Sequence, residues 1–226
     1  MSNISEYLNS SIGRKQIVAT TGLLLILFVI GHLAGNLLIY LGPDAFNGYA
    51  KKLEHLRPGL YFIETGLLFI FVIHMYFTAL LVLENIQARS VNYAQYRPRG
   101  QRSLATRLMS VSGVFILCFI IWHLMDFTFA DKTGPRSVLA DGKSYALYGV
   151  VYNSFTDPIH GLLYIIAMMC LGLHLSHGVQ SFAQTFGFSS PQYTPAIKKI
   201  SNWFALVMAL GYSSIPIYIF LQTIKH

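Results

Sequence analysis

The chain has 226 residues, of which 54% are hydrophobic and only 11% are charged, and its mean hydropathy is +0.52. Soluble domains carry about 25% charged residues, so most of this chain must face something other than water. A disulfide-stapled secreted module is excluded, because Cys118 and Cys170 both lie inside apolar runs. The formal charge of +7 does not indicate nucleic acid, since the basic residues lie in short segments between apolar stretches, as expected beside a lipid surface.

Three motifs that would indicate other chemistry do not occur in the sequence. CxxCH is absent, which excludes covalent attachment of a c-type haem. The phosphate-binding GxxxxGK[ST] and the zinc-protease HExxH are absent as well.

Five apolar stretches are each long enough to cross a bilayer, which takes roughly 20 helical residues. They lie at about 16–41, 59–83, 105–129, 159–185 and 201–223. All five should be helices, because an unpaired backbone group in lipid costs several kcal/mol. The expected fold class is therefore an all-α integral membrane protein with five transmembrane helices, in one domain over 1–226. No internal repeat is expected from the sequence.

The connecting segments carry turn signals. Gly42-Pro43 ends the first stretch, and Asp157-Pro158 predicts an N-cap followed by proline at the first helical position. The longest link, about 130–158, is expected to form a small surface cap.

The Lys and Arg residues predict the orientation. Nine of them lie on the side of the N-terminus and seven on the other side. The strongest single signal is the second link, which holds Arg89, Arg97, Arg99, Arg102 and Arg107. Because positive charge is retained in the cytoplasm, we expect the N-terminus in the cytoplasm and the C-terminus outside. The same link also suggests a docking surface for an acidic partner.

Ionisable side chains inside a bilayer are costly, so each is a functional candidate. Five of the eight histidines fall well inside the predicted spans: His32, His74, His123, His174 and His177. The first and third spans run outward, and His32 and His123 lie beyond their midpoints. The second and fourth run inward, which places His74 and His174 on the cytoplasmic side of centre.

Four successive helices thus supply two pairs at two depths, roughly 10 Å apart at about 1.5 Å per residue. This arrangement predicts two stacked haems b, each held by two histidines, so the first four helices are expected to form a haem-binding bundle. Such haems have no open coordination position and carry electrons.

Other interpretations of the histidines remain open. They can be interhelical hydrogen-bond partners, or ligands of zinc, although no carboxylate or thiolate completes a tetrahedral site. His160 lies 14 residues before His174, so one helix could serve both depths. His177 is one turn from His174 and is a rival ligand, a propionate partner or a helix contact.

The segments around these histidines resemble a known family. FVIGHLAGN, FVIHMYFTALLV, FIIWHLMDF and LGLHLSHGVQSFAQTFG, in this order, are similar to the di-haem cytochrome b subunit of succinate:menaquinone oxidoreductases and quinol:fumarate reductases. The stretch GPDAFNGYAKKLEHLRP also matches in character, and the resemblance covers nearly the whole chain.

The resemblance implies an anchor in the cytoplasmic membrane that binds a flavoprotein subunit and an iron–sulfur subunit. Succinate and fumarate interconvert at the FAD, outside this chain, and electrons pass through the iron–sulfur clusters and two haems b to or from menaquinone. By motif position the inner haem takes His74 and His174, and the outer haem takes His32 and His123.

Quinol oxidation releases protons, so a carboxylate is expected near the outer haem. Glu54 matches an acidic position of this family and is ranked first, followed by Glu64 and Asp126. Each has a plainer interpretation, as a solvated loop carboxylate or as the partner of a nearby Lys or Arg.

Two alternative functions remain. One is a di-haem cytochrome b that serves another quinone-linked dehydrogenase, such as a hydrogenase or formate dehydrogenase. The other is a haem-free membrane anchor or a transporter, although no broken helix with acidic residues near the midplane is visible.

Overall fold

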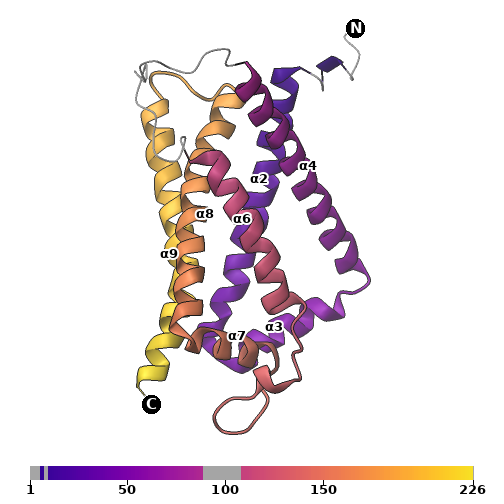
Figure 1. Ribbon diagram of the computed structural model, residues 1–226, viewed down its shortest axis with the longest axis vertical. Helices are drawn as coiled ribbons and strands as arrows, with labels where there is room; N and C mark the ends of the chain where they lie inside the picture. Colours follow the sequence, from indigo (N-terminus) through magenta and orange to yellow (C-terminus); the bar gives the residue numbers. More distant parts are fainter. Residues whose placement is uncertain (1–5, 8–9, 89–107, 226) are drawn as a thin grey trace.

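Five helices form a bundle in the computed structural model, which describes residues 6, 7, 10–88 and 108–225 (Figure 1). They are α2 (Ser11–Asn36), α4 (Gly59–Gln87), α6 (Met109–His123), α8 (Pro158–Thr185) and α9 (Thr194–Ile224). With the short turns that extend two of them, all five are long and apolar enough to cross a membrane. The predicted all-α membrane fold is therefore confirmed.

Two of the helices begin earlier than the apolar pattern indicates. α2 begins at Ser11, where the Ser10 hydroxyl accepts a hydrogen bond from the backbone N–H of Gly13 at 3.0 Å. α9 begins at Thr194, with Pro195 in its first turn. These first turns carry polar and charged side chains outside the hydrocarbon layer, so hydropathy alone does not reveal them.

The predicted start of the fourth span is confirmed in detail. The Asp157 side chain caps α8 by accepting a hydrogen bond from the backbone N–H of Ile159 at 2.9 Å, and Pro158 occupies the first helical position. At the end of the first span, Gly42 has φ +90°, which favours glycine.

Two links that the sequence marks only as turns or as a cap contain helices. After a 3₁₀ turn, η1 (Leu37–Leu41), the first link forms α3 (Pro43–His55), and the longest link forms η3 (Pro135–Ser137) and α7 (Ala146–Thr156). Asn47 joins the two links: its amide donates to the Tyr145 carbonyl at 2.8 Å, and its carbonyl accepts from the Tyr148 backbone N–H at 3.0 Å. Figure 1 shows α3 and α7 together across the lower end of the bundle.

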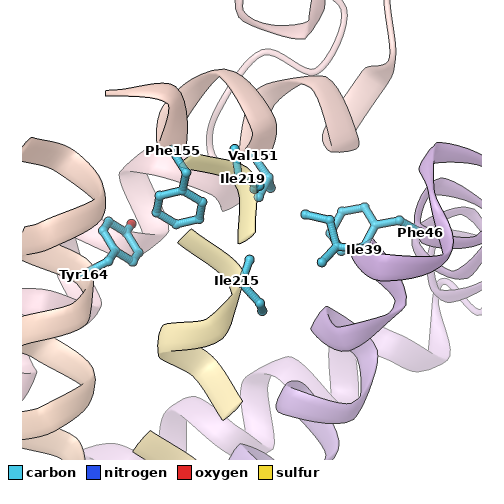
Figure 2. Packing of buried hydrophobic residues seen from close by; sticks show 7 residues of the cluster. All are labelled: Ile39, Phe46, Val151, Phe155, Tyr164, Ile215 and Ile219. Atoms are coloured by element: carbon cyan, nitrogen blue, oxygen red, sulfur yellow. The ribbon is translucent and has the colours of Figure 1, made fainter. Parts of the chain in front are cut away.

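The buried core lies at this lower end (Figure 2). It gathers side chains from η1, α3, α7, α8 and α9, namely Ile39, Phe46, Val151, Phe155, Tyr164, Ile215 and Ile219. A second cluster, Leu33, Leu175, Ala205 and Met208, holds α2, α8 and α9 together at mid-height. The fifth long helix therefore forms the wall against which α8 packs.

Helix α4 is packed differently from the others. Within the described chain α4 packs extensively only against α2, and none of its residues is buried. An ion pair between Arg14 and Glu84 joins the start of α2 to the end of α4. The face of α4 turned away from α2 thus has no protein covering among the described residues. The arginine-rich link from Arg89 to Arg107 lies outside the described residues.

Candidate functional site

His32 and His123 approach each other across the bundle. Their ring centroids are 5.9 Å apart and their planes are nearly perpendicular, at 89°. A bond between a metal and an imidazole nitrogen is about 2 Å, so two imidazoles on opposite sides of one metal ion have ring centres about 6 Å apart. The predicted pairing of α2 with α6 is therefore compatible with one iron between these two rings. We refer to them as the lower pair.

Aromatic rings fix both members of the lower pair. Phe28 stacks on His32 with centroids 5.3 Å apart, and Phe119 stacks on His123 at 5.8 Å. From α9, the Tyr212 ring lies 6.2 Å from His32. The Nδ1 atom of His123 is buried and has no hydrogen-bond partner among the described residues.

His74 of α4 is held by a hydroxyl group of α2. Its Nδ1 atom lies 3.1 Å from Thr21 Oγ1, which itself lies 2.7 Å from the carbonyl of Ile17. A carbonyl only accepts, so the hydroxyl donates its proton there and accepts from the Nδ1–H of His74. The lone pair of Nε2 is then left on the opposite side of the ring, where it can bind a metal.

His174 of α8 is held in the same manner by α6. Its Nδ1 atom lies 3.1 Å from Ser112 Oγ, and this hydroxyl donates to the carbonyl of Met109 at 2.9 Å. The ring therefore also offers Nε2. We refer to His74 and His174 as the upper pair.

The spacing along two helices places the upper pair at one depth. An added Cβ at Gly22 would lie 3.3 Å from His74 Cε1, and one at Gly113 would lie 3.7 Å from His174 Cε1. Each glycine precedes a member of the lower pair by ten positions, and α2 and α6 run in the same direction (Figure 1). The two depths are therefore about 15 Å apart at about 1.5 Å per residue, more than the roughly 10 Å expected from span midpoints.

The three candidate carboxylates differ in their surroundings. Glu54 lies on α3 and is exposed, and Glu64 is exposed at the start of α4, 3.3 Å from the guanidinium of Arg57. Asp126 is buried, with 8% of its surface exposed, in a π-helical turn, η2 (Leu124–Thr128), directly after His123. Sequence reasoning ranked Asp126 last because a position near a span end says nothing about what covers the side chain.

Asp126 is the centre of a polar cluster at the lower end of the bundle. Its Oδ1 accepts from Arg136 Nη2 at 2.9 Å, and its Oδ2 accepts from the Tyr164 hydroxyl at 2.9 Å. His160 Nε2 lies 2.8 Å from the same Oδ2. The Arg136 side chain is nearly half exposed, so the cluster extends from the buried carboxylate to the surface of the cap.

His160 belongs to this cluster. It lies one turn before Tyr164, whose ring stacks on it at 5.0 Å, and it is engaged with Asp126. His177 lies one turn beyond His174 on α8 and is half-buried.

The donor set fits a haem b at each pair. In the described part of the chain no three His, Cys, Asp or Glu side chains gather to hold a metal ion. Each pair supplies two imidazoles, and a macrocycle would supply the remaining ligands of an iron. The glycines beside the upper pair let the edges of the two imidazoles lie against α2 and α6.

The fold and the paired histidines define a multi-pass helical membrane protein with histidine side chains inside its helix bundle. Residues 84–212, more than half of the chain, match the family of the succinate dehydrogenase/fumarate reductase transmembrane subunit. The chain belongs to this family. It is also 24% identical over 187 residues to the succinate dehydrogenase cytochrome b558 subunit of Bacillus subtilis (strain 168), which covers 83% of this chain and 84% of that protein. No solved structure matches the chain.

Proposed function

We propose that this chain anchors a succinate dehydrogenase or fumarate reductase in the cytoplasmic membrane and carries its electrons to or from menaquinone. A flavoprotein subunit and an iron–sulfur subunit would bind on the cytoplasmic side, where the N-terminus is expected. Family membership supports this proposal over a hydrogenase or formate dehydrogenase partner and over a transporter. The observation that carries it is the 5.9 Å approach of His32 and His123.

Two haems b would be held by the two pairs, the inner one by His74 and His174 and the outer one by His32 and His123. When bound, a haem b would supply a one-electron redox couple, and the two imidazoles of each pair would hold its iron. The chain's own residues orient the rings: hydroxyls hold the upper pair, and phenylalanines stack on the lower pair. Electrons would thereby cross between the two depths.

Menaquinol that is oxidised beside the lower pair gives up two electrons and two protons, and menaquinone that is reduced takes up the same number. The electrons would leave or arrive one at a time, and the protons need a base among the chain's own residues. Of the three expected carboxylates, Asp126 has the best support, because it is buried one turn from His123 and linked through Arg136 to the surface. Glu54 and Glu64 lie on the exposed side of α3 and α4 and would serve proton exchange with water.

The test of the haem assignment is the haem content of detergent-purified protein, measured as pyridine haemochrome. About two haems b per wild-type chain are expected. Alanine at His32, His74, His123 or His174 should remove at least one of them, whereas His177→Ala should keep both. A well-folded wild type without haem would overturn the proposal. Loss of haem in His177→Ala would assign the α8 ligand to His177 instead of His174.

The assignment of partners is tested separately, by purifying the complex from the native membrane through a tag on this chain. Succinate-dependent reduction of its haems is expected, together with FAD and iron–sulfur signals in the same complex. A complex that reduces the haems only with hydrogen or formate would contradict the proposal while leaving the haem sites intact.

A further inference from the structure

An internal repeat relates α2 to α6. Counted back from the lower-pair histidine, both helices carry phenylalanine four positions earlier, glycine ten positions earlier and a hydroxyl residue eleven positions earlier. The corresponding residues are Thr21, Gly22, Phe28 and His32 in α2, and Ser112, Gly113, Phe119 and His123 in α6. The repeat escapes a search for long similarity because it consists of a few positions on one face of each helix.

The repeated positions make the same contacts in both helices. Each phenylalanine stacks on the histidine of its own helix, and each hydroxyl–glycine pair faces the histidine of the following long helix. The bundle thus contains two equivalent hairpins, α2–α4 and α6–α8. The equivalence is in the contacts themselves, since Nδ1 and Cε1 of the upper histidine face the hydroxyl and the glycine in both hairpins.

We propose that Thr21 and Ser112 are matched positioning residues. They select Nε2 of His74 and His174 as the iron-binding nitrogen, and both lower the reduction potential of the same haem. This inference rests on the proposed haem sites. It extends them by assigning control of the upper haem to two residues that are not ligands and lie on the helices that ligate the lower haem.

The direction of the tuning follows from the hydrogen bond. An imidazole that donates its second N–H to an acceptor is a stronger electron donor to its metal. It therefore stabilises the ferric form more than the ferrous form, so removal of the acceptor should raise the reduction potential of the upper haem. The two hydroxyls lie beside His74 and His174, which belong to the upper pair, so the lower haem should not respond.

The glycines have a complementary task, which is to let the ring edge approach the neighbouring helix. At Gly22 an added Cβ would lie 3.3 Å from His74 Cε1, closer than ordinary contact, whereas at Gly113 the 3.7 Å separation from His174 is ordinary. Gly22→Ala should therefore displace its histidine more than Gly113→Ala. Gly66→Ala is the matched control on α4, because a Cβ there meets nothing within 4 Å.

The experiment is a redox titration of both haems in the purified complex, with electron paramagnetic resonance of the ferric forms as a second readout. Thr21→Val and Ser112→Ala should each raise the reduction potential of the same haem by about 59 mV. For a one-electron couple this is about a tenfold higher ferrous-to-ferric ratio at a given ambient potential. Thr21→Ser should restore the wild-type value. The exposed neighbours Thr20 and Ser110 supply the controls Thr20→Val and Ser110→Ala, which should leave both haems unchanged.

The possible results distinguish a failure of this inference from a failure of the proposed function. Two haems of unchanged potential and unchanged resonance in both variants would overturn the positioning role while leaving the haem sites standing. Shifts of two different haems would show that His74 and His174 do not share an iron. A wild type without haem would remove the proposed function itself.

Discussion

The hydroxyl of Tyr212 on α9 donates a hydrogen bond to the backbone carbonyl of Val29 on α2, at 2.7 Å. The bond lies one turn before His32, and the Tyr212 ring also contacts that imidazole. The fifth long helix, which carries no histidine, thereby fixes the position of a helix that does.

The Tyr212–Val29 contact predicts a small and local loss on substitution. Tyr212→Phe keeps the ring and removes the hydrogen bond, which averages about 0.6 kcal/mol between membrane helices. We expect a slightly lower thermal unfolding midpoint and an altered resonance of the lower haem only. Tyr193→Phe, at an exposed ring beside the start of α9, is the control. A change at the upper haem instead would contradict the placement of Tyr212.

The buried carboxylate of Asp126 predicts a selective loss of quinone chemistry. Asp126→Asn keeps the shape of the side chain but cannot take up a proton. We expect succinate:menaquinone activity of the complex to fall about tenfold or more, within the usual range for a lost general base. Haem content and succinate oxidation with a soluble electron acceptor should not change.

A structural role of the same cluster is separated by a second variant. Arg136 Nη2 also donates to Ser154 Oγ at 2.7 Å, so Ser154→Ala weakens the attachment of the cap without touching the carboxylate. If both variants lost quinone activity equally, Asp126 would be a structural anchor of the cap and not a base.

Close packing of α8 on α9 predicts sensitivity at Gly172. A Cβ added there would lie 3.1 Å from the Ala209 Cβ and 3.3 Å from the Ala205 carbonyl oxygen. Overpacking of this kind costs about 1 kcal/mol or more. Gly172→Ala should therefore lower the thermal midpoint and the haem content, since Gly172 lies two residues before His174. Gly178→Ala, at an open position of the same helix, should do neither.

The cap predicts a loss of local order at low pH. The pKa of Asp141 lies below its ordinary value, because the carboxylate accepts from the backbone N–H of Lys143 and from the Tyr145 hydroxyl. A lowered pKa in the fold stabilises the cap at pH values above the ordinary value of about 3.9, and this stabilisation disappears as the pH falls through the lower folded value.

Amide hydrogen exchange, corrected for the intrinsic effect of pH, measures this loss. Protection of the Tyr145 amide, which donates to the Ser137 carbonyl, should decrease below about pH 4. In Asp141→Asn the protection should be lower and independent of pH over this range. Unchanged protection in the wild type down to about pH 2 would contradict the prediction.

The sequence sufficed for the spans but not for the elements outside the hydrocarbon layer. Hydropathy locates a helix by what surrounds it, so the five apolar runs are found while α3 and α7 are missed. Both lie across the end of the bundle, and contacts such as those of Asn47 with Tyr145 and Tyr148 hold them there. These contacts join residues about a hundred positions apart, which no local pattern reveals.

The sequence proposes which residues form the candidate site, but it indicates only part of their geometry. The depths of the histidines indicate which of them pair, and His32 with His123 lie together as the lower pair. The hydroxyls of Thr21 and Ser112 carry no signal until their common distance from a histidine is noticed. The burial of Asp126 depends on a cap folded from a distant link, so the sequence ranks it below Glu54.

The hairpin arrangement has a consequence for biosynthesis. With the proposed pairing, each haem takes one ligand from the α2–α4 hairpin and one from the α6–α8 hairpin. No haem site is complete while the ribosome is still making the first half of the chain. Insertion of α6 completes the lower pair, and insertion of α8 completes the upper pair. A chain truncated in the link before α6 should enter the membrane and remain colourless. Loading of the lower haem would then report that translation has passed His123, and loading of the upper haem would report that it has passed His174 and that the two hairpins have met.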